Sequence, residues 1–159
     1  YAVQMTPDEL KVARRWSLVS DAERAADWRI SGVHHTAVHA ETGRLFVLMH
    51  QGGPETFQEP GTEVWVYDVQ TGEKRQTLEL KELSLSIGVS PGAQPRLYSV
   101  DYVMPMPFLA TAWIFATEGK DGVVRRLQQQ VNLYDADSGE HLRTVDGLPY
   151  GYLNMVLPW

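Results

Sequence analysis

The sequence of 159 residues predicts an all-β fold made of short antiparallel strands. Two observations lead to this prediction. Runs rich in β-branched and aromatic residues alternate with turns that contain Gly, Pro, Asp or Ser, which is the pattern of a strand meander. In addition, residues 64–77 recur as residues 131–144, with six of the fourteen positions identical. An internal repeat of this kind indicates that the strands are grouped into similar units.

Each repeated unit is expected to contain four strands. A short segment precedes the outer hairpin of each unit, residues 34–39 in the first and residues 84–90 in the second. Four-stranded antiparallel units that repeat along a chain are typical of β-propeller blades, which run about 40–45 residues. The repeat distance from residue 64 to residue 131 is 67, so insertions are expected, and the two evident ones are residues 51–61 and 102–130.

The order of these patterns predicts a partial propeller of about two to three blades. Its predicted parts are the end of a preceding blade with a short connecting helix (1–32), a blade (33–80), a blade that carries the insertion 102–130 (84–148), and the first strand of a further blade (150–159). Because a propeller removes its sheet edges by closing into a ring, and two units cannot close one, we expect a piece of a longer chain.

The first 32 residues contain two capping patterns. Residues 6–9 (Thr-Pro-Asp-Glu) fit a helix start and also a type I turn, and we interpret them as a hairpin turn before a strand at 12–19. Ser20 with Glu23 forms a capping box, which predicts a short helix that leads to Trp28.

The strands of the repeated units border turns that contain Gly, the residue that most readily adopts a positive φ. The expected strands are 44–50, 64–68, 96–100 and 131–135, and the expected turns are 40–43, 69–72, 90–92 and 136–139. Asp68 and Asp135 occupy equivalent positions directly before two of these turns. This equivalence favours a role in capping turn N–H groups over a catalytic role.

Composition excludes several classes of function. The chain carries 14 Lys and Arg against 20 Asp and Glu, and its net charge of −6 predicts no binding to nucleic acid. It has no cysteine, which excludes disulfides and thiolate chemistry. The longest apolar stretch, residues 104–116, is interrupted by Pro105 and Pro107 and is too short to span a bilayer, so no membrane segment is expected.

The histidines are the one candidate for metal binding. His35 and His39 would share one face of a strand, and His34 lies beside them, so neutral imidazoles could bind zinc or copper. A third ligand with a recognised spacing is missing. The alternative is that one or two of the histidines, including His50, pack at the inner edge of a blade and form hydrogen bonds with the backbone.

The insertion 102–130 has a pattern of its own. Residues 111–117 and 123–127 predict either an extra hairpin or an extension of the blade strands. Its apolar residues are candidates for a contact with a partner protein, the alternative being that they fold over their own sheet. These candidate interface residues are Met104, Met106, Phe108 and Trp113.

Residues 21–29 (DAERAADWR) and 32–53 (GVHHTAVHAETGRLFVLMHQGG) resemble the heavy subunit of quinoprotein amine dehydrogenases, the family of methylamine and aromatic amine dehydrogenases. Residues 63–73 (EVWVYDVQTGE) are similar to the next part of the same subunit. The resemblance covers nearly the whole chain apart from the insertion 102–130, which departs from the family pattern. It implies that the sequence corresponds to the C-terminal part of the subunit.

The resemblance also implies a function. The family's heavy subunit is a seven-bladed propeller of the periplasm, and its partner is a light subunit that carries the cofactor tryptophan tryptophylquinone. The enzyme oxidises primary amines to aldehyde and ammonia and passes electrons to a copper protein or a cytochrome. Because the catalytic base and the quinone belong to the light subunit, no catalytic or cofactor-binding residue is assigned to this chain.

Two other functions compete with this one. The unfamiliar insertion 102–130 could have replaced the subunit interface, which would make the chain a propeller-type protein-binding module with no enzymatic role. A small metal-binding β protein that uses His34, His35 or His39 is the third hypothesis.

Overall fold

The computed structural model describes residues 2–5, 8–31, 35–53, 56, 59–103 and 128–149. Its elements are almost entirely antiparallel strands, so the predicted all-β class is confirmed. The strands are β1 (Ala2–Met5), β2 (Leu10–Arg14), β3 (Trp28–Ile30), β4 (Thr36–His39), β5 (Arg44–Gln51), β6 (Gly61–Asp68), β7 (Lys74–Val89), β8 (Arg96–Val103), β9 (Gln128–Asp135) and β10 (His141–Pro149), and the helix is α1 (Asp21–Ala25).

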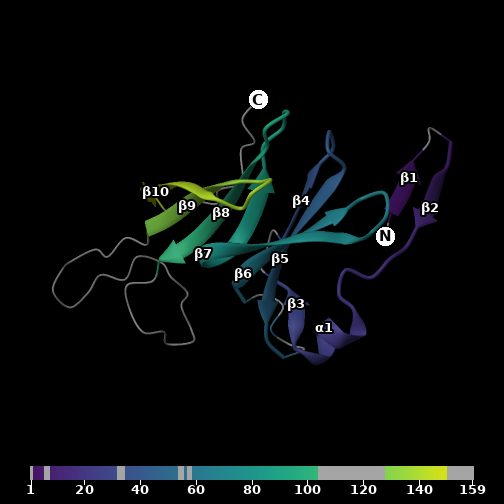
Figure 1. Ribbon diagram of the computed structural model, residues 1–159, viewed down its shortest axis with the longest axis horizontal. Coiled ribbons are helices and arrows are strands. Elements are labelled where there is room, and N and C mark those ends of the chain that lie inside the picture. Colours follow the sequence, from purple (N-terminus) through teal and green to yellow (C-terminus); the bar gives the residue numbers. More distant parts are fainter. Residues whose placement is uncertain are drawn as a thin grey trace.

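One large sheet contains every described strand except β1 and β2, in the order β10-β9-β8-β7-β6-β5-β3, with β4 also paired to β5 (Figure 1). The long strand β7 pairs with two different strands. Its residues 74–79 pair mainly with β6, whereas residues 84–89 pair with β8. We call β4, β5, β6 and residues 74–79 the first half-sheet, and residues 84–89 with β8, β9 and β10 the second half-sheet.

The sequence interpretation separated two strands that the structure joins in β7. The reason lies in residues 80–83 (Leu-Lys-Glu-Leu), which contain no Gly, Pro, Asn or Asp to start a turn. The chain therefore stays extended while its hydrogen-bonding partner changes. Tyr134 supports this crossing, because its hydroxyl oxygen accepts a hydrogen bond of 3.0 Å from the backbone N–H of Lys81.

The tight turns have the predicted chemistry. Glycines occupy the positive-φ positions at Gly43 (62°), Gly72 (75°), Gly92 (100°) and Gly139 (76°). The carboxylate of Asp68 accepts hydrogen bonds of 2.8 Å from two backbone N–H groups of its turn. Asp135 does the same at 3.0 and 2.9 Å, so the predicted capping role of both residues is confirmed.

These caps also favour the charged form of each carboxylate. The backbone N–H groups of Thr71 and Ser138 are the main cause that lowers the pKa of Asp68 and Asp135 below its usual value. Both carboxylates also pair with an arginine, Asp68 with Arg75 and Asp135 with Arg96.

The N-terminal segment confirms one prediction and corrects another. β1 and β2 form the expected hairpin, which stands apart from the large sheet (Figure 1). The strand expected at 12–19 is wrong, because β2 ends at Arg14 and residues 15–19 are irregular. Leu18 and Val19 pack on the sheet instead, and the Tyr67 hydroxyl donates a hydrogen bond to the Leu18 carbonyl.

The main core lies between the two half-sheets and draws residues from both. Its members are apolar side chains of β5, β6, β7, β8 and β9 together with one alanine of the following turn: Phe46, Leu48, Val64, Val66, Leu78, Ile87, Val89, Leu97, Tyr134 and Ala136. All of them are buried. Burial of this apolar surface, at about 25 cal/mol per Å², is what holds the half-sheets face to face.

Several predictions fall on residues outside the described part. The hairpin expected at 111–117 and 123–127 and the strand expected at 150–159 are among them. The ends of the insertion 102–130 are described, and they belong to β8 and β9, where residue 102 pairs with 129 and residue 103 with 128. No helix in the described ranges is long and apolar enough to cross a membrane.

Candidate functional site

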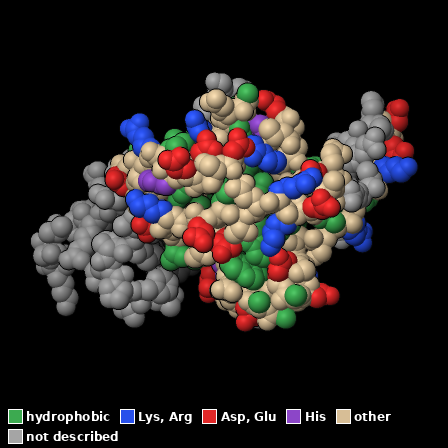
Figure 2. Space-filling view, in the orientation of Figure 1, with side chains coloured by type: hydrophobic (Ala, Val, Ile, Leu, Met, Phe, Trp, Pro, Cys, Tyr) green, Lys and Arg blue, Asp and Glu red, His purple; other side chains and the backbone are tan. Residues whose placement is uncertain are grey.

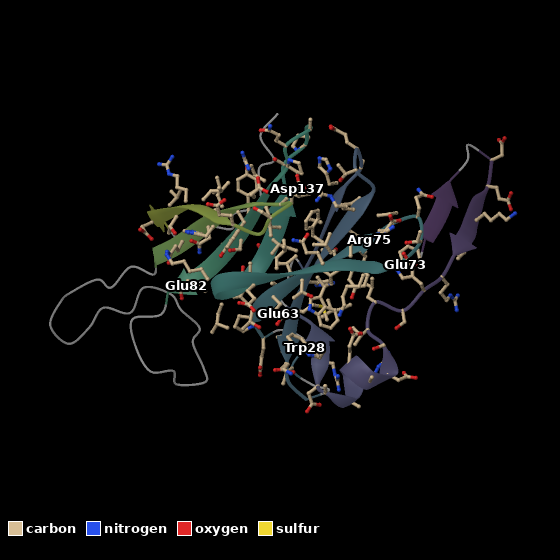
Figure 3. All side chains as sticks on the ribbon, viewed as in Figure 1. Trp28, Glu63, Glu73, Arg75, Glu82 and Asp137 are labelled. Carbon is tan, nitrogen blue, oxygen red and sulfur yellow. The ribbon has the colours of Figure 1, made fainter. Side chains whose placement is uncertain are left out.

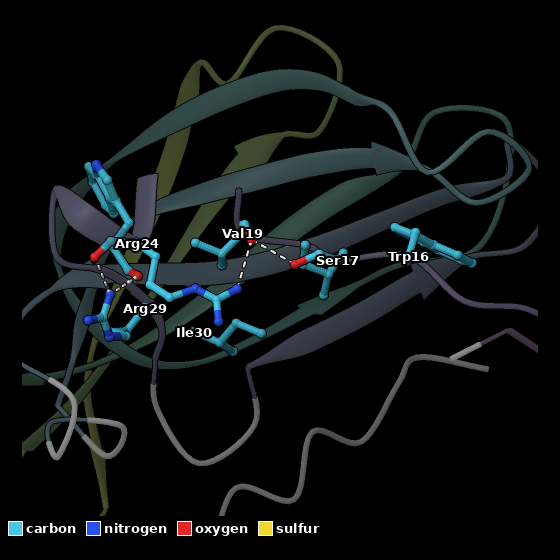
Figure 4. A pocket seen from close by; sticks show the side chains of 8 residues that line it. Trp16, Ser17, Val19, Arg24, Arg29 and Ile30 are labelled. Atoms are coloured by element: carbon cyan, nitrogen blue, oxygen red, sulfur yellow. Dashed lines mark hydrogen bonds between the residues drawn. The ribbon is translucent and has the colours of Figure 1, made fainter. Parts of the chain in front are cut away.

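A pocket of about 450 Å³ opens on the side of the first half-sheet that faces away from the second half-sheet (Figure 4). We call this side, which carries Val47, Met49, Trp65 and Tyr67 of β5 and β6, the outer face. The pocket is lined by the segment before α1, by α1 and by β3, through Trp16, Ser17, Leu18, Val19, Arg24, Trp28, Arg29 and Ile30.

The capping box of α1 fixes the entry to this pocket. Glu23 N–H donates to the Ser20 hydroxyl at 3.2 Å, and the Glu23 carboxylate accepts from Ser20 N–H at 2.8 Å. The helix ends after one turn, because Asp27 adopts a positive φ of 63° that redirects the chain into β3. This reversal places Trp28 and Arg29 in the wall of the pocket that the segment before the helix also lines.

The two guanidinium groups of the pocket are held by backbone carbonyls. Arg24 donates to Val19 O at 3.1 Å, and Arg29 donates to Arg24 O at 2.9 Å and to Trp28 O at 2.7 Å (Figure 4). Asp27 lies 3.7 Å from the Arg29 guanidinium. These bonds tie the wall of the pocket together, so both arginines are structural parts of the wall.

An ion pair fastens α1 to the outer face. The Lys74 ammonium contacts the Glu23 carboxylate and lies 3.7 Å from the centre of the Trp65 ring, which is cation–π geometry. Burial alone would raise the pKa of Glu23. Hydrogen bonds from Lys74 and from Ser20 outweigh it and lower that pKa from 4.5 to about 2.

Beside the pocket, aromatic side chains of β3 and β6 pack together. Trp28 packs on Trp65 with ring centroids 5.1 Å apart and a tilt of 50°. Trp28 and Glu63 are labelled in Figure 3, and the Glu63 carboxylate accepts a hydrogen bond of 2.8 Å from Trp65 Nε1. Burial raises the pKa of the Tyr67 hydroxyl, and the nearby Glu23 charge adds to this effect. The Tyr67 hydroxyl therefore stays a neutral donor.

The described lining of this pocket is mainly apolar. The eight described residues that line it include no carboxylate, histidine or lysine, and the Ser17 hydroxyl donates to Val19 O at 2.6 Å. A nucleophile without a base has no means of activation. The apolar outer face extends to Val38, which pairs with Leu45 and is 58% exposed, and hydrophobic side chains show at the surface near β3 in Figure 2.

The structure describes two of the three histidines considered as metal ligands, His35 and His39, together with His50. His39 is buried beside Arg44 at one end of β5, with Nδ1 2.7 Å from the Thr42 hydroxyl. His50 is buried at the other end and bonds to Thr56. His35 is half-buried, and His34 falls outside the described residues. In the described ranges no three His, Cys, Asp or Glu side chains form a group that could hold a metal ion.

Both buried histidines contact threonine hydroxyls, and the backbone of Arg29 and Thr56 also interacts with the His50 ring. The four candidate interface residues, at 104, 106, 108 and 113, lie outside the described part of the chain. Sequence reasoning did not find the pocket. The sequence feature that could have indicated the pocket is the pair of tryptophans, Trp16 and Trp28, on either side of the capping box.

The family model for the methylamine dehydrogenase heavy chain (MADH) matches residues 1–133, which include the first half-sheet, the second half-sheet as far as residue 133 of β9, and the described lining of the pocket. The chain belongs to the methylamine dehydrogenase heavy chain family. The match confirms the family predicted from residues 21–53, and it runs through the segment 102–130 that was interpreted as an insertion.

Individual family members agree with this assignment. The methylamine dehydrogenase heavy chain of Paracoccus versutus is 32% identical over 133 residues, which cover 84% of this chain and 26% of the relative. That of Methylorubrum extorquens is 29% identical over 100 residues, 63% of this chain and 24% of the relative. That of Methylophilus methylotrophus is 35% identical over 81 residues, 51% of this chain and 20% of the relative. The chain thus spans about a quarter of the length of these heavy chains.

Proposed function

We propose that this chain is part of the non-catalytic heavy subunit of a periplasmic amine dehydrogenase. The subunit would support a light subunit that carries tryptophan tryptophylquinone. The complete enzyme would oxidise primary amines to aldehyde and ammonia and pass the electrons to a copper protein or a cytochrome. No residue of this chain is given a catalytic or cofactor-binding role, because the quinone supplies the oxidation from the light subunit.

The observation that carries this proposal is the family match over residues 1–133. Two features of the structure agree with a non-catalytic role in holding a light subunit. The two half-sheets share one core, which is how neighbouring blades of a propeller pack, and we take residues 33–80 and 84–148 as two such blades. The described lining of the pocket on the outer face offers apolar contact area.

Co-expression tests the proposal. The full-length heavy subunit that contains this sequence is produced with the light subunit and maturation proteins encoded beside it, and the purified complex is assayed with a series of primary amines. We expect quinone absorbance from the light subunit and amine-dependent reduction of an artificial electron acceptor. A complex that shows neither contradicts the proposal, and recovery of only a partner without quinone favours a protein-binding module.

If the chain has a supporting role, a substitution in it should change the assembly of the complex and not the rate of the reaction. Trp28→Ala in the full-length subunit removes the ring that packs on Trp65, so we expect less assembled complex but an unchanged turnover number per quinone. Glu79→Gln is the matched control, because Glu79 is exposed on β7 and should leave both quantities unchanged. A fall in turnover per quinone for Trp28→Ala would instead place this segment in the reaction.

A further inference from the structure

His50, near the end of β5, has a defined protonation pattern. Its side chain is buried, with 2% of the residue exposed, and its Nε2 lies 2.8 Å from the Thr56 hydroxyl oxygen. That hydroxyl donates its only hydrogen to the Gly53 carbonyl at 2.7 Å. The Thr56 oxygen therefore accepts from His50, and Nε2 must carry the ring proton. Nδ1 is left unprotonated, buried and without a hydrogen-bond partner.

This chain of bonds closes the turn that follows β5. Thr56 N–H donates to Gly53 O at 3.2 Å, and Glu59 N–H donates to Thr56 O at 3.0 Å. Gly52 is required here, because a Cβ at that position would lie 2.4 Å from the Thr56 hydroxyl oxygen. The imidazole and the Thr56 hydroxyl thus fix the described residues of this turn in one arrangement.

The same turn is attached to the segment that leads into and out of β3. Gly52 N–H donates to Asp27 O at 2.9 Å, and the Ser31 hydroxyl donates to Glu59 O. Ser31 N–H in turn donates to Leu48 O at 2.9 Å. The turn after β5 therefore links the sheet to residues 27–31, which border the pocket.

We propose that His50 is a pH-sensitive fastening of this turn, and that a second proton, on Nδ1, releases the bonds that join Gly52, Thr56 and Glu59 to each other and to residues 27–31. Protonation would place a positive charge on a ring that is 2% exposed and whose Nδ1 makes no hydrogen bond in the folded turn. The folded arrangement resists that proton, so acid conditions favour states in which these bonds are broken.

The charged groups around the ring act in both directions. Burial is the largest cause and lowers the pKa of His50 below its ordinary value of 6.5. The Glu59 carboxylate and the backbone of Arg29 and Thr56 favour the charged ring, whereas the Arg29 guanidinium opposes it. Because the folded-state pKa is the lower one, the fastening is complete above about pH 6.5 and is lost progressively as the pH falls below it.

Two measurements on the full chain test this proposal. Proton–carbon NMR of the imidazole follows the His50 titration directly, and we expect a midpoint below 6.5. Hydrogen exchange is then measured at the amides of Gly52, Thr56 and Glu59 from about pH 7.5 to about pH 5, corrected for intrinsic rates. Protection should fall by up to about tenfold for each unit by which the midpoint lies below 6.5.

His50→Gln is the decisive variant, because its amide can donate to Thr56 as Nε2–H does but cannot titrate. We expect the three amides to keep their protection at low pH in this variant. His39→Gln is the matched control, since His39 is equally buried at the opposite end of β5, and it should retain the wild-type pH dependence at these amides.

Two results would overturn the proposal. One is a His50 midpoint at or above 6.5 in the wild-type chain, a measurement that needs no variant to fold. The other is an acid-induced loss of protection that persists unchanged in His50→Gln.

Discussion

Arg44, the first residue of β5, forms an ion pair of 2.5 Å with Asp137, which lies 93 residues later in the turn between β9 and β10. The same guanidinium donates to Ala136 O at 3.3 Å, and Gln76 of β7 donates to Asp137 O at 2.9 Å. Asp137 is labelled at the end of the sheet where these strands meet in Figure 3. The first half-sheet thus contacts one turn of the second at several points, which fixes how the halves align.

We therefore predict that Arg44→Ala lowers the free energy of unfolding by about 1 kcal/mol, measured by urea denaturation. The Arg44 side chain is 17% exposed, so its loss also removes packing on the Phe46 ring. Arg75→Ala is the control. Arg75 is 53% exposed and pairs with Asp68 within a single hairpin, so its loss should stay within about 0.5 kcal/mol. Equal losses for the two variants would mean that the contact between the half-sheets adds nothing.

A second prediction concerns two glycines with the same backbone conformation. Gly43 has a φ of 62° and open space where a Cβ would lie, whereas Gly139 has a φ of 76° and a Cβ there would lie 2.8 Å from Leu78 Cδ2. Gly43→Ala should cost about 1 kcal/mol for the left-handed backbone alone. Gly139→Ala should cost at least about 1 kcal/mol more, because Leu78 is buried in the core between the half-sheets.

Urea denaturation of both variants under one set of conditions measures this difference. A Gly139→Ala loss no larger than that of Gly43→Ala would show that Leu78 moves aside without cost, and that the turn after β9 is not tightly packed against β7.

The parts of the fold that the sequence predicted have local causes. Gly72 lies four residues after Asp68, and Gly139 lies four residues after Asp135. A short stretch of sequence therefore determines both the turn and its cap. The Ser20 and Glu23 capping box is equally local. These features predicted the strand borders and the helix without any knowledge of the tertiary structure.

The features that the sequence did not predict depend on contacts between distant residues. The pocket exists because Trp28 reaches Trp65 and Leu18 reaches Tyr67, pairs that are 37 and 49 residues apart in the sequence numbering. No periodicity within either segment records such a contact. The continuity of β7 was missed for a related reason, since the change of partner at residues 80–83 is a property of the whole sheet.

The ion pair between Glu23 and Lys74 leads to a third prediction, a loss of stability in acid. The pKa of Glu23 is about 2 in the folded chain against an ordinary value of 4.5. A carboxylate with a lowered pKa contributes stability above its ordinary pKa and loses it as the pH falls toward the folded-state value. We expect about 1 kcal/mol to disappear between pH 4.5 and about pH 2, because the pair is partly exposed and water screens it.

Unfolding of the wild type and of Glu23→Gln is compared across this range of pH. The variant should be less stable at neutral pH, and the difference should shrink as the pH falls. A difference that stays constant with pH would assign the effect to the capping box and not to the charge of Glu23.

The fourth prediction concerns the ring that anchors the pocket. Trp28→Ala should lower the free energy of unfolding by about 2 kcal/mol, less than for a fully buried tryptophan, because Trp28 is half-buried. It should also expose the segment around α1 to trypsin at Arg24, which is exposed but held by its bond to Val19 O. Trp28→Phe keeps an aromatic ring against Trp65, so trypsin should cleave it more slowly than Trp28→Ala. If both variants are cleaved at the wild-type rate, contacts other than Trp28, such as the Glu23–Lys74 ion pair, hold this segment on the outer face.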